Sequence, residues 1–401
     1  RAFVTASQVV FVTDGEQRSA LAVVRSLGRA GHRVYVCASR RRSLAGASRF
    51  ARDEARVSDP LAHPDRFADE VRALLARWNV SVLIPIGDAS LLALLPHRAD
   101  LTRVLLPFPD ETVVRRIADK AELLEVATRA GIAVPRQRTA MDSDALGALA
   151  AELAYPVVLK PARSVGEHAG QRAKLVVRHA ANARDLERAR HELSAAAYPV
   201  LVQQRIVGPG VGIFLLVWNG ETIATFSHRR IREKPPSGGV SVYRESIPAD
   251  PELVARSRAL LDAFGWCGVA MVEYKMDERT GTPFLMEVNG RFWGSVQLAI
   301  DAGVDFPALL LRASLGEEVR PVSAYRTGIR SRWFWGDVDH LLARLRHSPA
   351  ALSLPADTPG RWHAVRDFLR VRAGDREEIL RADDPRPFAR ETAQWFGAVI
   401  R

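Results

Sequence analysis

Two glutamates, an asparagine and an arginine near residue 280 have side chains that bind metal ions and phosphate: Glu273, Glu287, Asn289 and Arg291. Strand-like runs at residues 269–276 and 284–288 flank a stretch of turn formers, so the segment predicts a β-hairpin. With the turn centred near Thr280, Glu273 lies directly opposite Glu287. Asn289 then points to the same face, because side chains alternate along a strand.

The predicted hairpin sets two carboxylates against each other, and like charges that face each other across a strand pair repel. A hard divalent cation removes this repulsion, and Mg²⁺ is commonly held by one or two carboxylates while substrate phosphates complete its shell. Glu273, Glu287 and Asn289 are therefore candidate metal ligands. The alternative is a solvated hairpin whose two glutamates face water.

Length and composition indicate a globular protein. The chain has 401 residues, 47% hydrophobic and 26% charged, which suits two or three domains. No apolar run reaches the ~20 residues that span a bilayer, and the N-terminus lacks a signal-peptide pattern, so we expect a cytoplasmic protein without a membrane partner. Cys37 and Cys267 have no metal-type or redox-type spacing, which argues against a disulfide framework.

The net charge of +11 raises the question of nucleic-acid binding. Of the 57 basic residues, 52 are arginines scattered along the chain, which indicates a composition bias. A nucleic-acid site would show a basic stripe with interleaved aromatic residues or a recognisable module, and neither is present. We therefore expect no specific nucleic-acid partner.

The first 110 residues alternate strands and helices. Strands are predicted at residues 8–13, 34–38, 81–86 and 104–106, and helices at 19–30, 65–78 and 89–95. This alternation predicts a parallel α/β domain over residues 1–110, and the first turn lacks the GxGxxG pattern of a dinucleotide site. Ligands of such domains bind at the carboxyl ends of the strands, which makes Asp14, Gly15, Gly87 and Asp88 pocket candidates. The alternative is that they only form turns.

Beyond residue 110, two of the chain's five lysines occupy positions suited to phosphate. Lys120 follows Asp119, which can cap a helix that runs to residue 130, and Lys160 ends a short apolar strand. A lysine is a compact charge suited to phosphate oxygens. The same region predicts helices at 145–154 and 183–196, a loop at 164–173, and strands at 175–177 and 200–208.

Six short motifs in this order resemble those of one superfamily. They are DK at 119–120, VVLKP at 157–161, VQQRIVGPG at 202–210, SHRRIREKPPSGG at 227–239, VEYK at 272–275 and MEVNGRFWGS at 286–295. Over about residues 5–320 the chain resembles the ATP-grasp superfamily, and most of all its little-characterised carboxylate-amine ligase-like members. The resemblance implies a two-sheet ATP-grasp domain at 111–320, with a lid subdomain at about 156–208.

In ATP-grasp enzymes the nucleotide lies between two antiparallel sheets, and the resemblance implies how this chain would bind it. Lys120 and Lys160 match the lysines that contact the phosphates. Gln203, Gln204 and Ile206 match the segment between the sheets, whose backbone reads the adenine edge.

The hairpin residues also match the superfamily pattern. Glu273, Glu287 and Asn289 match the metal ligands, in agreement with the hairpin argument. Arg291 matches the arginine beside the γ-phosphate and the acyl intermediate, and is the candidate catalytic residue. The implied cofactors are ATP and Mg²⁺, with Mn²⁺ as an alternative metal.

Three positions depart from the superfamily pattern. The lid loop keeps only Gly166 and Gly170 of a usually glycine-rich sequence, so its grip on phosphate is looser or uses His168. The segment between the sheets has two glutamines where an acid is usual. Gly210 stands where an acid often holds the ribose, which leaves the ribose contacts open.

Two further segments lie outside the matched roles. Residues 228–239 carry three arginines and a lysine before a turn; they are either a flexible segment for an anionic substrate or an exposed charged loop. Residues 321–401 predict a mainly helical extension that packs on the catalytic body. Its tryptophans, Trp333, Trp335 and Trp362, are expected in the core.

The predicted fold class is α/β, with an α+β catalytic part. The resemblance implies an ADP-forming ligase that activates a small-molecule carboxylate as an acyl phosphate and joins it to an amine acceptor. Two alternatives stay open: a carboxylase-type enzyme that phosphorylates bicarbonate, and a non-catalytic nucleotide-binding protein. A homodimer is one option for its assembly.

Overall fold

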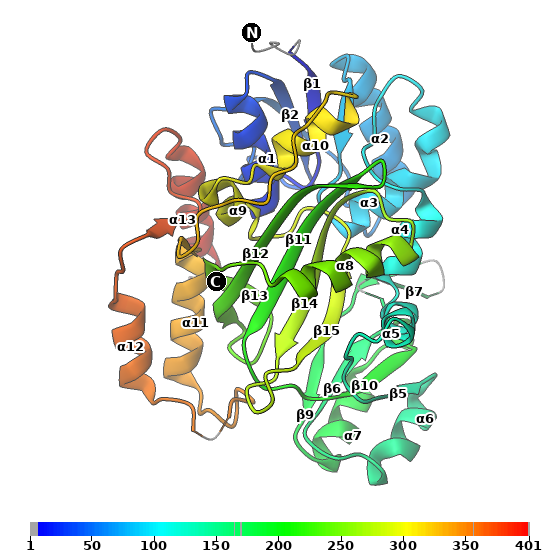
Figure 1. The fold of residues 1–401 in the computed structure, drawn as a ribbon, viewed down its shortest axis with the longest axis vertical. Helices are drawn as coiled ribbons and strands as arrows, with labels where there is room; N and C mark the ends of the chain where they lie inside the picture. The colour runs from blue at the N-terminus through cyan, green and yellow to red at the C-terminus, as the bar shows by residue number, and fades with distance from the viewer. Residues whose placement is uncertain (1–6, 164, 169–170, 356, 400–401) are drawn as a thin grey trace.

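The computed structural model describes residues 7–163, 165–168, 171–355 and 357–399. Figure 1 shows a parallel sheet with helices at the top, a seven-stranded sheet in the middle and a smaller sheet below, while the C-terminal helices lie at the left. The predicted α/β fold class is confirmed. Among the described residues, no helix combines the length and apolar character needed to cross a membrane.

The N-terminal sheet is parallel, in the order β3-β2-β1-β4. Its elements are β1 (Val9–Val12), α1 (Arg18–Arg29), β2 (Arg33–Ala38), β3 (Ala51–Arg56), α2 (Pro64–Arg77), β4 (Val82–Ile84) and α3 (Asp88–Leu94). The predicted alternation is confirmed, but β3 was not expected, because its polar sequence ARDEAR pairs only along the sheet edge. The predicted strand at 104–106 is wrong: Leu105 makes a single bridge to Val82.

Two helices, α4 (Glu111–Ala118) and α5 (Lys120–Arg129), lead from this sheet to the next. The carboxylate of Asp119 accepts hydrogen bonds from the backbone N–H groups of Ala121 at 3.0 Å and Glu122 at 3.3 Å, which confirms the predicted cap. Lys120 therefore stands at the first position of α5, and α5 packs against the central sheet.

The smaller sheet, called the lid sheet below, has the order β5-β10-β6-β9. Its elements are β5 (Gln137–Ala140), α6 (Ser143–Ala148), β6 (Val157–Pro161), β9 (Arg178–Ala180), α7 (Ala183–Glu192) and β10 (Val200–Gln204). A separate apolar core around Leu146, Leu159 and Leu186 supports it. The predicted strand at 175–177 is wrong by three residues, and the predicted loop contains a hairpin of β7 (Val165–His168) and β8 (Gln171–Lys174).

The central sheet has the order β15-β14-β11-β12-β13-β16-β17. Its strands are β11 (Gly210–Trp218), β12 (Glu221–Lys234), β13 (Val240–Ser246), β14 (Gly268–Met276), β15 (Pro283–Asn289), β16 (Arg330–Arg332) and β17 (Asp375–Glu377). Helix α8 (Pro251–Ala263) crosses the near face in Figure 1. The other face packs through Phe214 and Phe226 toward α9 (Val296–Ala302), α10 (Phe306–Ser314) and α1.

The basic segment at 228–239 is not the flexible or exposed loop that the sequence suggested. Residues 228–234 are the end of β12 and pair with β13. Their charges are matched: Arg230 pairs with Glu273, Arg232 with Asp337 and Lys234 with Asp339. Pairing between two neighbouring strands therefore overrides the weak β-propensity of this polar sequence.

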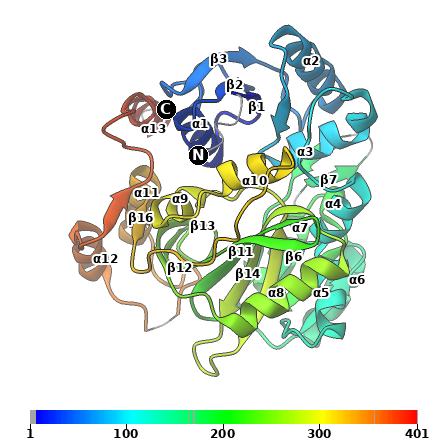
Figure 2. The same cartoon turned by 45° about the horizontal axis from the view of Figure 1, so that its top comes forward.

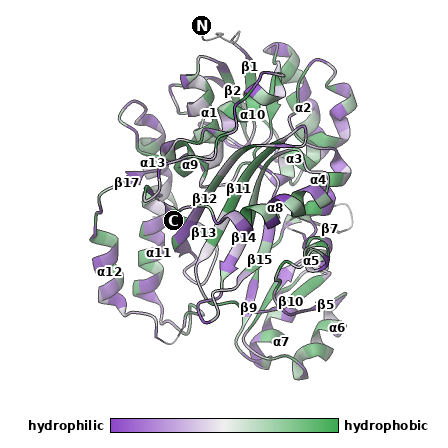
Figure 3. Ribbon diagram, in the orientation of Figure 1, coloured by the Kyte–Doolittle hydropathy of each residue, from purple (hydrophilic) through white to green (hydrophobic). Residues whose placement is uncertain are grey.

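The C-terminal extension is mainly helical, as predicted, with α11 (Phe334–Arg346), α12 (Arg361–Leu369) and α13 (Arg386–Val399). It also adds β16 and β17 to the central sheet, and Figure 2 shows α13 beside α1. Trp335 stacks on Trp395 at 4.3 Å, but Trp333 and Trp335 are only partly buried, and the core position predicted for Trp362 is wrong because it is 85% exposed. Figure 3 shows hydrophilic and hydrophobic residues along α12, and no residue of this helix is buried.

Candidate functional site

The hairpin of β14 and β15 has the predicted register. Glu273 lies directly opposite Glu287, and a β-bulge follows on the turn side of that pair. Asn289 donates a hydrogen bond from Nδ2 to Glu287 Oε1 at 3.1 Å, so the amide and this carboxylate share one face. The three predicted metal ligands are thus adjacent on the central sheet.

The two carboxylates are not left to repel each other, which corrects the sequence argument. Glu273 forms an ion pair with Arg230, and Lys120 Nζ lies 3.7 Å from Glu287 Oε2. Burial raises the pKa of Glu273, and Arg230 offsets this only in part. Burial also acts to raise the pKa of Glu287, but Lys120 and Lys160 outweigh it and hold that pKa below its ordinary value.

Both predicted phosphate lysines lie beside this hairpin. Lys120 is 7% exposed, and its backbone N–H donates to Ala162 at 2.8 Å, which ties the start of α5 to the end of the lid sheet. Lys160 Nζ lies 3.6 Å from Met286 Sδ, across the gap between the lid sheet and the central sheet. Burial lowers the pKa of Lys160, while Glu287 and Glu273 act in the opposite direction.

Arg291 forms a two-point ion pair with Asp88 of the N-terminal part. Its Nε lies 2.5 Å from Asp88 Oδ1 and its Nη2 lies 2.8 Å from Asp88 Oδ2. Burial would raise the pKa of Asp88, but Arg291 and nearby lysines hold it below the ordinary value. Asp88 was one of the predicted pocket candidates because of its place beyond a strand end. Its pairing with Arg291 was not predicted.

Two other pocket candidates support this position of Asp88. The carboxylate of Asp14 accepts hydrogen bonds from the Gly87 backbone N–H at 2.9 Å and from Ser90 Oγ at 2.8 Å. A Cβ atom on Gly87 would lie 2.7 Å from Asp14 Oδ1, so a larger residue there would force the Asp14 side chain to shift. Gly15 packs closely too, since its Cβ would lie 2.4 Å from Ser43 Oγ.

A cavity of about 340 Å³ opens beside these residues. Asp88, Lys120, Arg163, Glu287 and Asn289 line it, together with apolar side chains of α3, α4 and α5. Basic, acidic and amide groups thus converge on one cavity between the N-terminal part, the lid sheet and the central sheet. Such a combination of apolar walls and a few convergent polar groups is typical of a ligand site.

The predicted adenine-reading segment includes the last two residues of β10 and continues beyond the strand. Gln203 is buried, and its Nε2 donates to Gln137 Oε1 at 2.9 Å, so its side chain supports the neighbouring strand. Gln204 is exposed, and Ile206 is 4% exposed. Gly208 lets the backbone after β10 pass close to the end of β14, because a Cβ atom at this position would lie 1.8 Å from the carbonyl oxygen of Met276.

The lid hairpin leaves one expectation outside the described residues: Gly170 has no described structure, and the side chain of His168 is not described. No group of three or more His, Cys, Asp or Glu side chains that could hold a metal ion occurs in the part of the chain that the structure describes. A metal ion at this hairpin would therefore rest on two carboxylates and an amide oxygen.

The lid sheet and the central sheet face each other across the lysines and carboxylates, and this arrangement defines the ATP-grasp fold. A family model described as "ATP-grasp in the biosynthetic pathway with Ter operon" matches residues 197–336. The chain therefore has the fold of the ATP-grasp superfamily. It is 28% identical over 227 residues to the uncharacterized protein y4rH of Sinorhizobium fredii (strain NBRC 101917 / NGR234). This match spans 53% of the chain and 45% of that relative, less than half its length.

Solved structures from three organisms share the fold. The biotin carboxylase domain of Hydrogenobacter thermophilus 2-oxoglutarate carboxylase, solved with MgADP and bicarbonate, has a TM-score of 0.62, 18% identity and coverage of 80% of this chain and 73% of that one. The L-amino acid ligase of Bacillus licheniformis has a TM-score of 0.61 and 18% identity, and the match covers 79% of this chain and 78% of that one. The ADP complex of Staphylococcus aureus N5-carboxyaminoimidazole synthetase has a TM-score of 0.62 and 14% identity, and the match covers 80% of each chain.

Proposed function

We propose that the protein is an ATP-dependent ligase that joins a small-molecule carboxylate to an amine. The observation that carries the proposal is the convergence of Lys120, Lys160, Glu287 and Arg291 from three separate stretches of the chain on one region. We also propose the division into residues 1–110, 111–320 and 321–401. A protein that only bound nucleotide would not need an arginine held at the carboxyl end of the N-terminal sheet.

The donor set fits Mg²⁺. Glu273, Glu287 and the Asn289 side-chain oxygen would hold it, and hard oxygen ligands with few carboxylates suit a Mg²⁺ ion that also binds phosphates. When bound, the ion would neutralise phosphate charge during transfer. Arg230 already supplies one positive charge at Glu273, so a bound cation shares that carboxylate with the guanidinium or displaces it.

Lys120 and Lys160 would hold the phosphates of ATP from two sides. The adenine would lie beside Gln203, Gln204 and Ile206, between the two sheets. Because Lys160 is already placed against Met286 by the lid sheet, phosphate binding would need little reorganisation of that side chain.

The reaction has two steps. A carboxylate oxygen of the substrate attacks the γ-phosphorus and ADP leaves, which gives an acyl phosphate. The amine nitrogen then attacks the acyl carbon, the carbon–oxygen bond to phosphate breaks, and the amine loses a proton as the amide forms. Arg291 would fork onto the oxygens of the transferring phosphoryl group. Asp88 would orient it as a positioning residue through the two-point pair.

The test is ADP release from Mg·ATP in the presence of a panel of carboxylates, with and without amines and amino acids. The parent should release ADP in a way that depends on both substrates. Arg291→Lys keeps the charge but loses the fork, so it should bind Mg·ATP within a few-fold of the parent and turn over roughly 10²-fold more slowly. Unchanged turnover in this variant, or no substrate-dependent ADP release in the parent, contradicts the proposal.

A further inference from the structure

Helix α12 and the residues that follow it carry exposed apolar side chains. Trp362 is 85% exposed, the largest fraction of any large apolar side chain among the described residues, and Leu369 and Val371 are 68% and 79% exposed. Trp362 and Leu369 lie seven residues apart on α12, so they share one face of the helix. Figures 1 and 2 both show α12 at the outer edge of the molecule.

The opposite side of α12 is held against the body of the protein. The guanidinium carbon of Arg332 lies 4.1 Å from the ring centre of Phe368. Ala364 and Phe368 line a cavity of about 430 Å³ that also includes Ile206 and Gly210, the residues expected near the adenine and the ribose. The three exposed apolar side chains line neither this cavity nor the one beside the metal hairpin. The outward side of α12 is therefore separate from the proposed nucleotide site.

The exposed charges around these apolar side chains are mostly positive. Four arginines of residues 361–376 are exposed, namely Arg361, Arg366, Arg370 and Arg376. The same stretch has two acids, and Asp375 is occupied by hydrogen bonds from Tyr243 Oη at 2.6 Å and from the Arg372 backbone N–H at 2.7 Å. The other acid, Asp367, lies 3.9 Å from Arg366. Four exposed guanidinium groups thus face one partly exposed carboxylate. These four arginines and the three exposed apolar side chains are called the α12 surface below.

This combination of side chains indicates the kind of partner. Two copies of the α12 surface would repel each other, because both are positively charged. The apolar side chains stand singly among arginines at the edge of the molecule. A bilayer interface suits such a pattern, since tryptophan and leucine enter the headgroup region from one face of a helix while arginines meet anionic headgroups. A membrane with anionic lipids therefore matches both the charge and the apolar groups.

We propose that the α12 surface binds membranes that contain anionic lipids, with α12 lying along the bilayer surface. The arginines contact the lipid headgroups, and Trp362 enters the boundary between headgroups and acyl chains. The expectation of a chain without a membrane partner rested on the lack of a spanning segment, and contact with a bilayer surface needs none. The proposal does not depend on the ligase activity, because the α12 surface contains no residue of the proposed active site.

The test measures binding of the 401-residue chain to sedimented vesicles at about 0.1 M salt. Vesicles of phosphatidylcholine alone are compared with vesicles in which about one third of the lipid is phosphatidylserine. The parent should bind the anionic vesicles roughly ten-fold or more tightly. The series is repeated with a non-hydrolysable ATP analogue, with Mg²⁺ present in both series. Binding should be unchanged, because the α12 surface lies outside the nucleotide site.

The charge of the surface is tested with Arg366→Gln/Arg370→Gln, which should weaken binding to anionic vesicles roughly ten-fold. The matched control is Arg52→Gln/Arg103→Gln, which removes two exposed arginines from the N-terminal part. The control should bind nearly like the parent. This comparison separates a docking surface from the general attraction between anions and a chain of net charge +11.

The apolar part is tested with Trp362→Ser, which keeps the net charge. This variant should weaken binding about five-fold or more. Lipids with brominated acyl chains should quench the tryptophan fluorescence of the parent more than that of the variant. Met141→Ser is the matched control, because Met141 is 66% exposed beside the lid sheet, and it should bind like the parent. If Trp362→Ser does not fold, Leu369→Ser should still weaken binding.

Four outcomes would overturn the proposal. The first is a parent with no preference for anionic vesicles, and the second is binding that the ATP analogue abolishes, because the headgroups then occupy the nucleotide site. The third is a loss of binding that is equal in the α12 variants and their controls, which would mark unspecific attraction. The fourth is a glutamate-rich peptide that binds through Arg366 and Arg370 while vesicles stay unbound, which would assign the surface to an acidic protein.

Discussion

Each carboxylate of the metal hairpin has its own set of neighbours. Glu273 pairs with Arg230, whereas Glu287 lies near Lys120 and accepts from Asn289. Glu287 is the better-compensated anion, because two lysines hold its pKa down. A metal ion bound with nucleotide would add its charge while phosphates engage the lysines, so metal and nucleotide should bind cooperatively.

Replacing Glu287 with Gln tests this cooperation. Mg²⁺ and ATP together should raise the melting temperature of the parent more than the sum of their separate effects, through ligand linkage. Glu287→Gln should lose this additional increase in melting temperature, because a neutral amide cannot neutralise the charge of the metal ion. The control is Glu221→Gln at an exposed position of β12, which should keep it. Equal synergy in Glu287→Gln and the parent would show that this carboxylate is no metal ligand.

Lys160 should discriminate phosphate from base. Lys160→Ala should weaken ATP binding roughly 10- to 100-fold, the scale of losing one charge-assisted hydrogen bond, and leave adenosine binding nearly unchanged. Isothermal titration of both ligands measures the difference. Parallel losses for ATP and adenosine would make Lys160 a structural residue.

At the scale of elements, α13 is held to the start of α11 by tryptophans. Trp333 Nε1 donates to Glu391 Oε1 at 2.6 Å, and Trp335 Nε1 donates to Thr392 Oγ1 at 2.9 Å. Glu391 Oε2 is buried without a hydrogen-bond partner among the described residues. Burial raises the pKa of Glu391 to about 7, and the hydrogen bond from Trp333 offsets this only in part, so the buried position favours the protonated acid.

This raised pKa predicts a pH-dependent stability. The unfolded chain releases the Glu391 proton near pH 4.5 and the folded chain only near pH 7, so the folded state binds more protons in between. This group's contribution therefore falls as pH rises through that window. When the pH is raised from 5 to 8, the unfolding free energy of Glu391→Gln should increase by on the order of 2–3 kcal/mol relative to that of the parent.

Denaturant unfolding at both pH values measures the gain. Glu152→Gln, at an exposed position, is the control and should show no such trend. A difference between Glu391→Gln and the parent that stays constant from pH 5 to pH 8 would refute the assignment.

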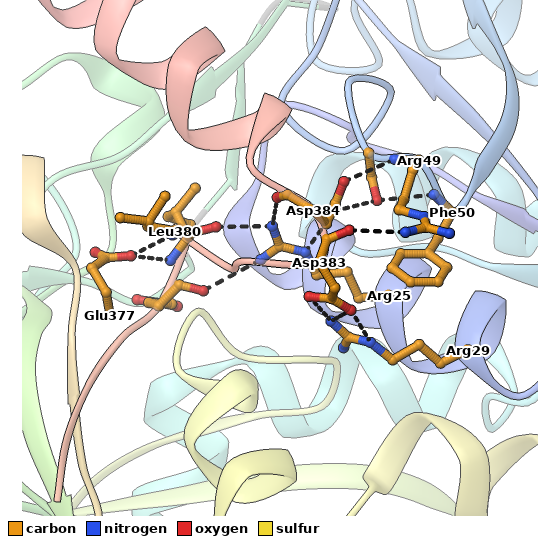
Figure 4. A network of polar contacts seen from close by, with 11 residues as sticks. Arg25, Arg29, Arg49, Phe50, Glu377, Leu380, Asp383 and Asp384 are labelled. Atoms are coloured by element: carbon orange, nitrogen blue, oxygen red, sulfur yellow. Dashed lines mark hydrogen bonds and ion pairs between the residues drawn. The ribbon is translucent and has the colours of Figure 1, made fainter.

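At the scale of the whole molecule, residues 377–384 connect the C-terminal extension to the N-terminal part. Figure 4 shows Asp384 against Arg25 and Arg49, with Asp383 against Arg29. Next to this network, Glu378 pairs with Arg18 of α1 and also with Arg244 of β13. The N-terminal part and the central sheet are therefore connected through buried carboxylates of the C-terminal extension, Glu378 and Asp384.

Two neighbouring aspartates give a matched test of this connection. The Arg25–Asp384 pair is buried, with side chains 1% and 0% exposed, whereas in the Arg29–Asp383 pair they are 37% and 49% exposed. Asp384→Asn leaves a buried guanidinium uncompensated and should cost about 3–5 kcal/mol of unfolding free energy. Asp383→Asn should cost about 0–1 kcal/mol. Similar losses for both variants in denaturant unfolding would contradict a buried connection.

Local sequence determined the parts of the site that lie within one hairpin or at one helix end. The opposition of Glu273 and Glu287 followed from strand alternation and the turn between them, and the cap at Asp119 followed from residue type and position. The superfamily resemblance supplied the expectation that two distant lysines meet this hairpin. Each inference needed only short-range geometry or a known pattern.

The tertiary structure alone decided the partners that compensate these charges. Asp88 lies 203 residues before Arg291, and Arg230 lies 43 residues before Glu273, so no local pattern connects either pair. Strand pairing also decided that residues 228–234 are a strand and that ARDEAR forms an edge strand, because backbone hydrogen bonds to neighbouring strands outweighed their polar sequences. The packing of separate elements brings these opposite charges together, and that arrangement exists only in the folded chain.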